Sequence, residues 1–125
     1  MTQSILVVDD EPMARNLLRL MLVRASFDVY EAEDGLDALD KLAEQRPDLL
    51  ILDVMMPGMD GLAVCREVRA DMNLTGIPII MLSAKTDYAS IQEGFAAGAS
   101  EYLTKPISMN ELTTHVRAML EKVPA

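Results

Sequence analysis

Residues 49–61, with the sequence LLILDVMMPGMDG, decide how this chain folds. Four aliphatic residues in a row, without polar alternation, are typical of a strand that is covered on both faces, as in a parallel sheet. The strand ends on the carboxylate of Asp53, and the Pro-Gly pair further on forces a turn before Asp60, which we expect to cap the next helix. Open α/β sheets bind their ligands at the carboxyl ends of central strands, so Asp53 stands where chemistry is expected.

A buried strand followed by an amphipathic helix recurs five times along the chain. We expect strands at residues 4–8, 28–31, 49–53, 77–82 and 101–104. The helical residues expected to face inward are Ala14, Leu17, Leu18, Met21, Leu22 and Ala25; Leu36, Leu39, Leu42 and Ala43; Val64, Cys65 and Val68; Ile91, Gly94 and Phe95; and Leu112, Val116 and Met119. Gly98 is expected to end the fourth helix, and Ser108 to cap the fifth. The alternation favours right-handed crossovers, so the sequence predicts an α/β fold with one doubly wound parallel sheet and helices on both faces.

Length and composition narrow the class of protein. With 125 residues, we expect a single domain over residues 1–125, in which about 121–125 form a tail or the start of a linker. A formal net charge of −9 repels phosphate backbones, so direct nucleic-acid binding is not expected. The sequence has neither a run of eighteen apolar residues nor a basic leader followed by an apolar one, so neither a membrane span nor a secretory signal is expected. The single cysteine, Cys65, is expected to be buried, excludes an internal disulfide and fits a cytoplasmic location.

Reactive side chains follow four of the expected strands. They are Asp9 and Asp10 after the first strand, Asp53 at the third, Ser83 at the fourth and Lys105 at the fifth. In a parallel sheet, all of these side chains gather at one edge. Three carboxylates repel one another in a partly desolvated site, and oxygen ligands without His or Cys favour Mg²⁺ as the cation between them.

A carboxylate beside Mg²⁺, a lysine and a hydroxyl is suited to accept a phosphoryl group. Asp53 would attack phosphorus in line, while Mg²⁺ and Lys105 neutralise charge on the phosphoryl oxygens and the Ser83 hydroxyl binds one of them. The chain has no glycine-rich phosphate loop leading into a helix and no G-K-[ST] motif. We therefore expect the phosphoryl group to come from a partner protein or a small phosphodonor.

The whole chain resembles the receiver domains of two-component response regulators, and it is similar to the single-domain chemotaxis and cell-cycle regulators. The motifs that carry the resemblance are VVDDEP at 7–12, LDVMMPGMDG at 52–61, LSA at 82–84, GA at 98–99 and YLTKP at 102–106. They span nearly the full length and stand in the right order on the right elements. The resemblance implies a flavodoxin-like (βα)5 fold with strand order 2-1-3-4-5.

The resemblance also implies how the acidic cluster works. Asp53 would be the phosphoacceptor, taking its phosphoryl group from a phosphohistidine of a sensor histidine kinase or a histidine phosphotransfer protein. Asp10, Asp53 and the backbone carbonyl of Met55 would ligate Mg²⁺ directly, and Asp9 would reach it through water.

A switch is implied as well. Ser83 and Lys105 would bind the phosphoryl oxygens, and the bond between Lys105 and Pro106 would be cis. Tyr102 would turn inward when Ser83 moves towards the phosphoryl group, and the surface of the fourth helix, fifth strand and fifth helix would signal to an output protein or domain. The chain would be a switch rather than an enzyme, catalysing only its own phosphotransfer and slow autodephosphorylation. Because the sequence leaves no further apolar stripe unassigned, we expect a monomer at rest, and dimerisation on phosphorylation is left open.

Simpler interpretations of single residues stay open. Asp9 and Asp10 can cap the first helix, and Tyr102 can be an ordinary aromatic residue of an edge strand. His115 borders an apolar stripe, so we expect a structural or surface role for it rather than phosphotransfer. The methionines in 55–59 suit either packing or partner docking.

Three other functions compete with a phosphorylation-controlled switch. A Mg²⁺-dependent phosphohydrolase would use Asp10 or Asp53 as its nucleophile, but haloacid dehalogenase-like enzymes carry an Asp-x-Asp motif and a cap domain that this chain lacks. A flavodoxin-like electron carrier would need a phosphate loop after the first strand, where this chain has acidic residues. A receiver used as a phosphate-independent dimerisation module would leave the acidic cluster without a function.

Overall fold

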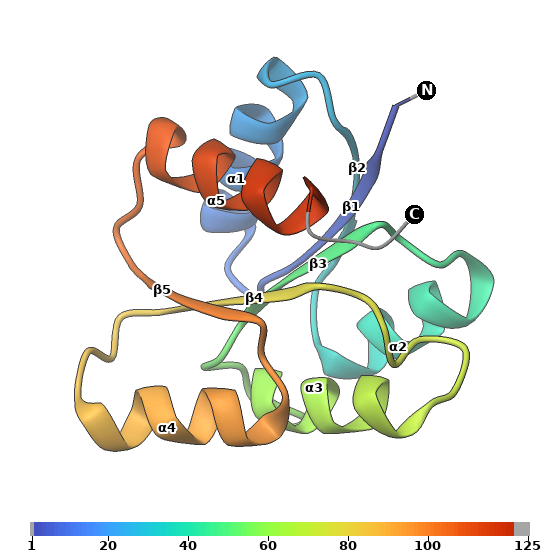
Figure 1. Ribbon diagram of the computed structural model, residues 1–125, viewed down its shortest axis with the longest axis vertical. Coiled ribbons are helices and arrows are strands. Elements are labelled where there is room, and N and C mark those ends of the chain that lie inside the picture. Colours follow the sequence, from blue (N-terminus) through green and yellow to red (C-terminus); the bar gives the residue numbers. More distant parts are fainter. Residues whose placement is uncertain (1, 122–125) are drawn as a thin grey trace.

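A computed structural model describes residues 2–121 of the chain as five parallel strands and five helices in strict alternation (Figure 1). The strands are β1 (Ser4–Val8), β2 (Asp28–Ala32), β3 (Leu49–Asp53), β4 (Ile79–Ser83) and β5 (Glu101–Thr104). The helices are α1 (Pro12–Arg24), α2 (Gly35–Glu44), α3 (Gly61–Ala70), α4 (Tyr88–Ala97) and α5 (Met109–Glu121). The strand order is β2-β1-β3-β4-β5, so the flavodoxin-like, doubly wound fold is confirmed.

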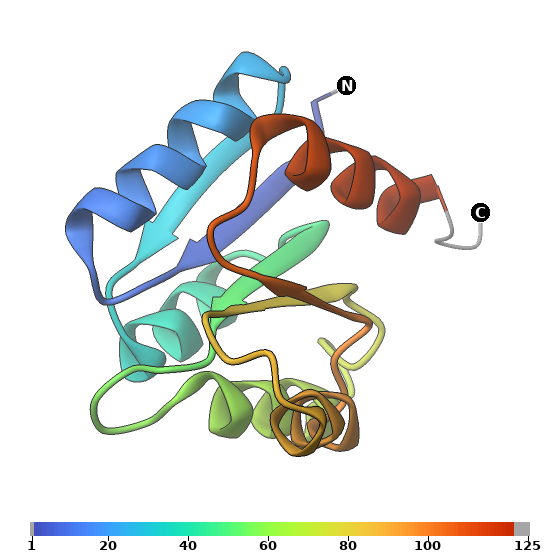
Figure 2. The ribbon, with the colours of Figure 1, turned by 90° about the vertical axis from the view of Figure 1, so that its left-hand side faces the viewer.

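The helices cover both faces of the sheet. Helices α1 and α5 lie on one face, and α2, α3 and α4 lie on the other (Figure 2). Every residue of β3 and β4 is buried, which is why these strands show no polar alternation in the sequence.

Two hydrophobic clusters, one on each face, form the core. Alternate strand residues point to opposite faces, so Leu50 and Leu52 pack with α2, α3 and α4, whereas Leu49 and Ile51 pack with α1 and α5. Cys65 is fully buried in the first of these clusters, as expected. The sheet is thus held from both sides, and its strand ends are fixed in position.

Short polar residues start the helices as predicted. The Asp60 carboxylate accepts from the Ala63 N–H at 2.9 Å and caps α3, and Ser108 Oγ accepts from the Glu111 N–H at 3.1 Å before α5. Gly98 ends α4 with φ +114°, in the left-handed conformation expected of it.

Four of the residues expected to face inward are instead exposed, and for these the prediction is wrong. Leu17, Leu36 and Phe95 are 54%, 66% and 43% exposed, respectively, and Ala43 near the end of α2 is exposed as well. Each follows or precedes a buried helical residue by one or two positions, which turns it by about 100–200° around the helix axis. The face of each helix that packs against the sheet is therefore narrower than the face over which the sequence places apolar residues.

The predicted tail or linker begins at Glu121, the last residue of α5, and its remaining residues lie outside those that the structure describes. Among residues 2–121, no helix has the length and apolar character needed to cross a membrane.

Candidate functional site

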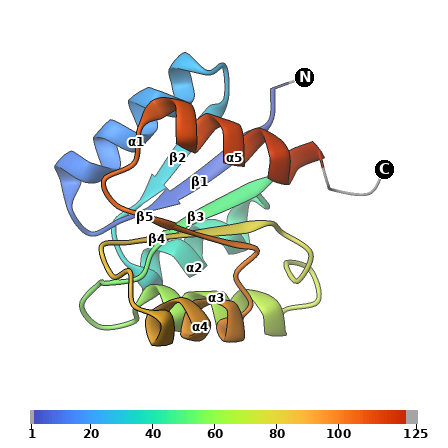
Figure 3. The ribbon, with the colours of Figure 1, turned by 60° about the vertical axis from the view of Figure 1, so that its left-hand side comes forward.

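The carboxyl ends of four strands meet at one edge of the sheet, on the left in Figure 3. Asp53 ends β3 and is paired in register with Leu82 of β4, and Ser83 is paired with Thr104 at the end of β5. Asp9 and Lys105 directly follow β1 and β5. The fold therefore brings together the site residues that the sequence placed at strand ends.

Three carboxylates form a compact cluster at this edge. One oxygen each of Asp9, Asp10 and Asp53 lies within 4.8 Å of the others. Asp9 is fully buried and Asp53 is 7% exposed, whereas Asp10 is exposed. The cluster is thus buried on one side and open to solvent on the other, so a small cation could reach it from solvent.

Backbone N–H groups hold two of these carboxylates in place. Asp9 Oδ1 accepts from the Glu11 N–H at 2.9 Å, and Asp53 Oδ1 accepts from the Met55 N–H at 3.4 Å. The Met55 carbonyl, expected to ligate Mg²⁺, follows Asp53 on the same loop, and its role stays a prediction.

Lys105 lies between two of the acids. Its Nζ is 3.1 Å from Asp9 Oδ2 and 3.4 Å from Asp53 Oδ1. Burial lowers the pKa of the Lys105 ammonium, but the hydrogen bond to Asp9 and the charge of Asp53 outweigh burial, so the pKa is raised above 10.5. Lys105 is therefore a fixed positive charge next to Asp53.

The Asp53 carboxylate has a raised pKa. Desolvation is the largest cause, and the negative charge of Asp9 adds to it, while Lys105 opposes both. One ammonium does not compensate the whole cluster, because three carboxylates and Lys105 leave two net negative charges. A hard divalent cation with oxygen ligands fits both this charge and this donor set, so these residues could hold Mg²⁺.

Ser83 and Tyr102 are linked through one residue. The Lys85 N–H donates to Ser83 Oγ at 3.1 Å, and the Tyr102 hydroxyl donates to the Lys85 carbonyl at 3.0 Å. The Tyr102 ring is 9% exposed, so it lies inward rather than on an open edge. The peptide bond between Lys105 and Pro106 is cis, as the family resemblance implies.

The simpler interpretation of Asp9 and Asp10 as helix caps is wrong. The N-cap of α1 is Glu11, whose carboxylate accepts from the Met13 N–H at 3.0 Å. Both aspartates are thus left for the cluster. His115 Nδ1 of α5 lies 3.8 Å from a carboxylate oxygen of Glu101 in β5, and both side chains are partly exposed, which agrees with a structural or surface role.

Two arginines with structural roles were not identified from the sequence. The Arg15 guanidinium on α1 donates to the Asp9 carbonyl at 2.8 Å and contacts the Glu31 carboxylate at 3.3 Å. Arg69 donates to the carbonyls of Thr75, Ile77 and Gly98. No sequence pattern signals either contact, because long side chains reach groups that are distant in the chain.

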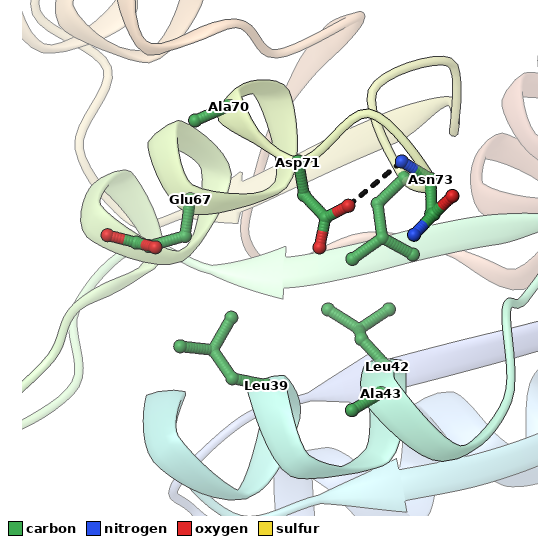
Figure 4. A pocket seen from close by; sticks show the side chains of 8 residues that line it. Leu39, Leu42, Ala43, Glu67, Ala70, Asp71 and Asn73 are labelled. Atoms are coloured by element: carbon green, nitrogen blue, oxygen red, sulfur yellow. Dashed lines mark hydrogen bonds between the residues drawn. The ribbon is translucent and has the colours of Figure 1, made fainter.

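A separate groove of about 570 Å³ lies between the ends of α2 and α3 (Figure 4). Its floor includes Leu39, Leu42 and Leu74, and Glu67 and Asp71 border it. None of the predicted site residues lines this groove, so it plays no part in the chemistry at the strand ends.

Fold and site together define a class, the flavodoxin-like α/β domains with an acidic cluster and a lysine at the carboxyl edge of the sheet. Comparison with known proteins gives the family, because the model of the response regulator receiver domain matches residues 5–117. The chain belongs to this family and is a receiver domain of two-component signalling, as the resemblance predicted.

Relatives and solved structures agree with this assignment. The chain is 46% identical to the DNA-binding response regulator MtrA of Mycolicibacterium smegmatis, over 98% of its own length and 52% of that protein. It thus spans about half the length of the curated relatives it matches.

Two solved structures share the complete fold. A response regulator of Chloroflexus aurantiacus has a TM-score of 0.94 with 37% identity, covering 98% of this chain and 100% of that one. The receiver domain of a sensor histidine kinase from Pseudomonas aeruginosa has a TM-score of 0.91 with 30% identity, over 98% and 100% of the two chains, and carries a magnesium ion in its active site cleft.

Proposed function

We propose that Asp53 accepts a phosphoryl group in a Mg²⁺-dependent reaction and that this modification switches the surface formed by α4, β5 and α5. The observation that carries the proposal is the position of Asp53, a nearly buried carboxylate within 4.8 Å of two others and 3.4 Å from Lys105. Such a site can bind a divalent cation and, with it, a phosphoryl group whose charge needs compensation.

The proposed reaction transfers a phosphoryl group from a histidine nitrogen of the donor to an Asp53 carboxylate oxygen. An Asp53 carboxylate oxygen attacks phosphorus in line, a new O–P bond forms, and the P–N bond of a donor phosphohistidine breaks as its imidazole leaves. Lys105, already held at the site, binds a phosphoryl oxygen, and the Ser83 hydroxyl donates to another. Asp10, Asp53 and the Met55 carbonyl would hold Mg²⁺ directly and Asp9 would hold it through water, and the ion supplies charge neutralisation on the phosphoryl oxygens.

The donor would be a sensor histidine kinase or a histidine phosphotransfer protein, because the sequence has no phosphate loop for a nucleotide. An apolar groove of about 370 Å³ runs beside Lys105, between α1 and the segment after β5. Leu17 and Pro106 are among its lining residues, and the exposed Met13 precedes it on α1. A partner that reaches Asp53 would meet this apolar surface first.

The consequence of the modification would be a shift in population between two arrangements of α4 and β5, transmitted through Ser83 and Tyr102. The output would be a partner protein or a further domain. The chain is proposed to be a monomer at rest and to work in the cytoplasm. It is also proposed to make no direct contact with nucleic acid, because its net charge of −9 repels phosphate backbones.

Intact mass spectrometry with acetyl phosphate tests this proposal. We expect a gain of one phosphoryl group that requires Mg²⁺ and is absent in the Asp53→Asn variant. Asp60→Asn is the matched control, because Asp60 lies in the same loop region but caps α3, and asparagine caps helices equally well. Steady hydrolysis of added phosphoesters over many turnovers would instead support a phosphohydrolase, and stoichiometric labelling of Asp53→Asn would contradict the assignment of the phosphoacceptor.

A further inference from the structure

Gly94 of α4 lies directly against the ring of Tyr102. A Cβ atom added at Gly94 would stand 2.8 Å from Tyr102 Cδ2, 3.1 Å from Tyr102 Cε2 and 3.2 Å from Met81 Sδ. A separation below 3.0 Å between carbon atoms is a clash, so the ring and a side chain at position 94 exclude each other. The inward position of Tyr102 therefore depends on Gly94 having no side chain.

The backbone gives no other reason for a glycine at this position. Gly94 lies within a regular helical segment, and its φ is not in the left-handed region, unlike that of Gly98 at +114°. Glycine inside a helix is about 1 kcal/mol less favourable than alanine. Glycine thus makes α4 itself less stable than alanine would, and the space that the Tyr102 ring occupies accounts for the glycine at this position.

The ring position is coupled to the candidate site. The inward ring places its hydroxyl on the Lys85 carbonyl at 3.0 Å, and the N–H of the same residue donates to Ser83 Oγ at 3.1 Å. Through the backbone of Lys85, these two hydrogen bonds link Tyr102 of β5 to Ser83 at the end of β4, beside Asp53. A displaced ring would remove the first of these bonds and leave Lys85 less restrained.

We propose that Gly94 is a positioning residue that sets the balance between the inward and outward positions of Tyr102, and through Lys85 the placement of Ser83. With a side chain at position 94, the ring would leave its pocket and become exposed to solvent. The surface presented to an output partner would then change without any modification of Asp53. This inference extends the regulation proposed above, and its consequence for signalling rests on that proposed function.

Fluorine NMR of protein labelled with 3-fluorotyrosine tests the position of the ring. The chain has three tyrosines, so the three signals can be assigned with Tyr30→Phe, Tyr88→Phe and Tyr102→Phe. We expect the Tyr102 signal to be insensitive to exchange of H₂O for D₂O, in contrast to that of Tyr88, which is 77% exposed. In Gly94→Ala, the Tyr102 signal should become as sensitive to solvent as that of Tyr88.

Gly76→Ala is the matched control. The nearest atom to a Cβ at Gly76 is Arg46 Nη2 at 3.8 Å, so this substitution adds the same methyl group without a clash. We expect it to leave the Tyr102 signal unchanged. An unchanged, solvent-protected Tyr102 signal in folded Gly94→Ala would overturn the proposal.

Urea unfolding tests the same contact between position 94 and the Tyr102 ring if Gly94→Ala folds poorly. The clash involves the Tyr102 ring, so in a Tyr102→Ala background the substitution Gly94→Ala should raise the urea midpoint, whereas in the wild-type background it should lower it. A lower midpoint in both backgrounds would contradict the role of the ring.

Adding acetyl phosphate and Mg²⁺ to the labelled wild type separates this inference from the proposed function. A shift of the Tyr102 signal that disappears in Asp53→Asn would support the coupling between site and ring. If Asp53 is not phosphorylated, this shift is absent from the start, but the effect of Gly94→Ala on solvent exposure remains.

Discussion

Asp53 is a charged group held where its charge is unfavourable. Its carboxylate is nearly buried and lies close to Asp9, and Lys105 compensates only part of the negative charge. The site therefore keeps an excess of negative charge that costs folding stability, and in the proposed function this excess would attract a cation. The proposed function of Asp53 and the stability of the fold would thus oppose each other.

The first prediction is that Asp53→Asn stabilises the protein in the absence of divalent cations. The gain should be about 1–2 kcal/mol at pH 7, because a buried, incompletely compensated charge is removed. Since the pKa of folded Asp53 is raised above 3.8, the unfolded chain loses this proton first as the pH rises. The gain should therefore be near zero below about pH 4, grow as the pH rises to the folded-state pKa, and stay constant above it. Urea unfolding between pH 3.5 and 8 measures this, and a variant less stable than the wild type at pH 7 would contradict the account.

At the scale of elements, α4 is attached mainly at its C-terminal end. Its two buried residues, Gly94 and Ala97, lie in the second half of the helix. Beyond it, the Arg69 guanidinium donates to the Gly98 carbonyl at 2.8 Å and to the Ser100 hydroxyl at 3.2 Å. Helix α3 thus anchors the end of α4 that is farther from the site, and leaves the end near Lys85 freer to move.

The second prediction concerns this anchor. Arg69→Lys should lower the unfolding free energy by about 1–3 kcal/mol, because a lysine ammonium cannot serve carbonyls as widely spaced as those of Thr75, Ile77 and Gly98. Hydrogen exchange should increase most around residues 75–77 and 97–100, where these acceptors lie. Arg66→Lys, at an exposed position of the same helix, should change neither quantity. Equal effects of the two substitutions would show that Arg69 has no special role.

At the scale of the whole molecule, a cation bound at the proposed site on the sheet edge should stabilise the entire fold. The third prediction is a gain in unfolding free energy with Mg²⁺, about 2.7 kcal/mol at a concentration one hundred times the dissociation constant. Asp10→Asn should lose most of this gain in unfolding free energy, because the substitution removes the solvent-exposed carboxylate of the cluster. Asp60→Asn should retain it. Equal stabilisation of all three proteins would mean that Mg²⁺ binds elsewhere.

The order of the elements and the position of the acidic cluster could be predicted from the sequence. Continuous aliphatic runs such as 49–52 identify strands buried on both faces, and parallel strands force residues that follow them to one edge. The parallel arrangement of the strands is therefore enough to predict that Asp9, Asp53 and Lys105 lie close together.

Details that depend on tertiary packing could not be predicted. Leu17, Leu36 and Phe95 look like core residues, because a stripe in the sequence does not show how narrow the contact of a helix will be. The carbonyl contacts of Arg69 and the fit of Gly94 to Tyr102 involve groups far apart in the chain. Such contacts leave no periodic signal.

The most direct test of the central claim is to locate the phosphoryl group. Protein treated with acetyl phosphate and Mg²⁺ is reduced with borohydride, which converts an aspartyl phosphate to homoserine, and its peptides are sequenced by mass spectrometry. The account predicts homoserine in place of Asp53 alone, and none when Mg²⁺ is left out. Homoserine in place of Asp10, or reduction at several surface carboxylates, would contradict it.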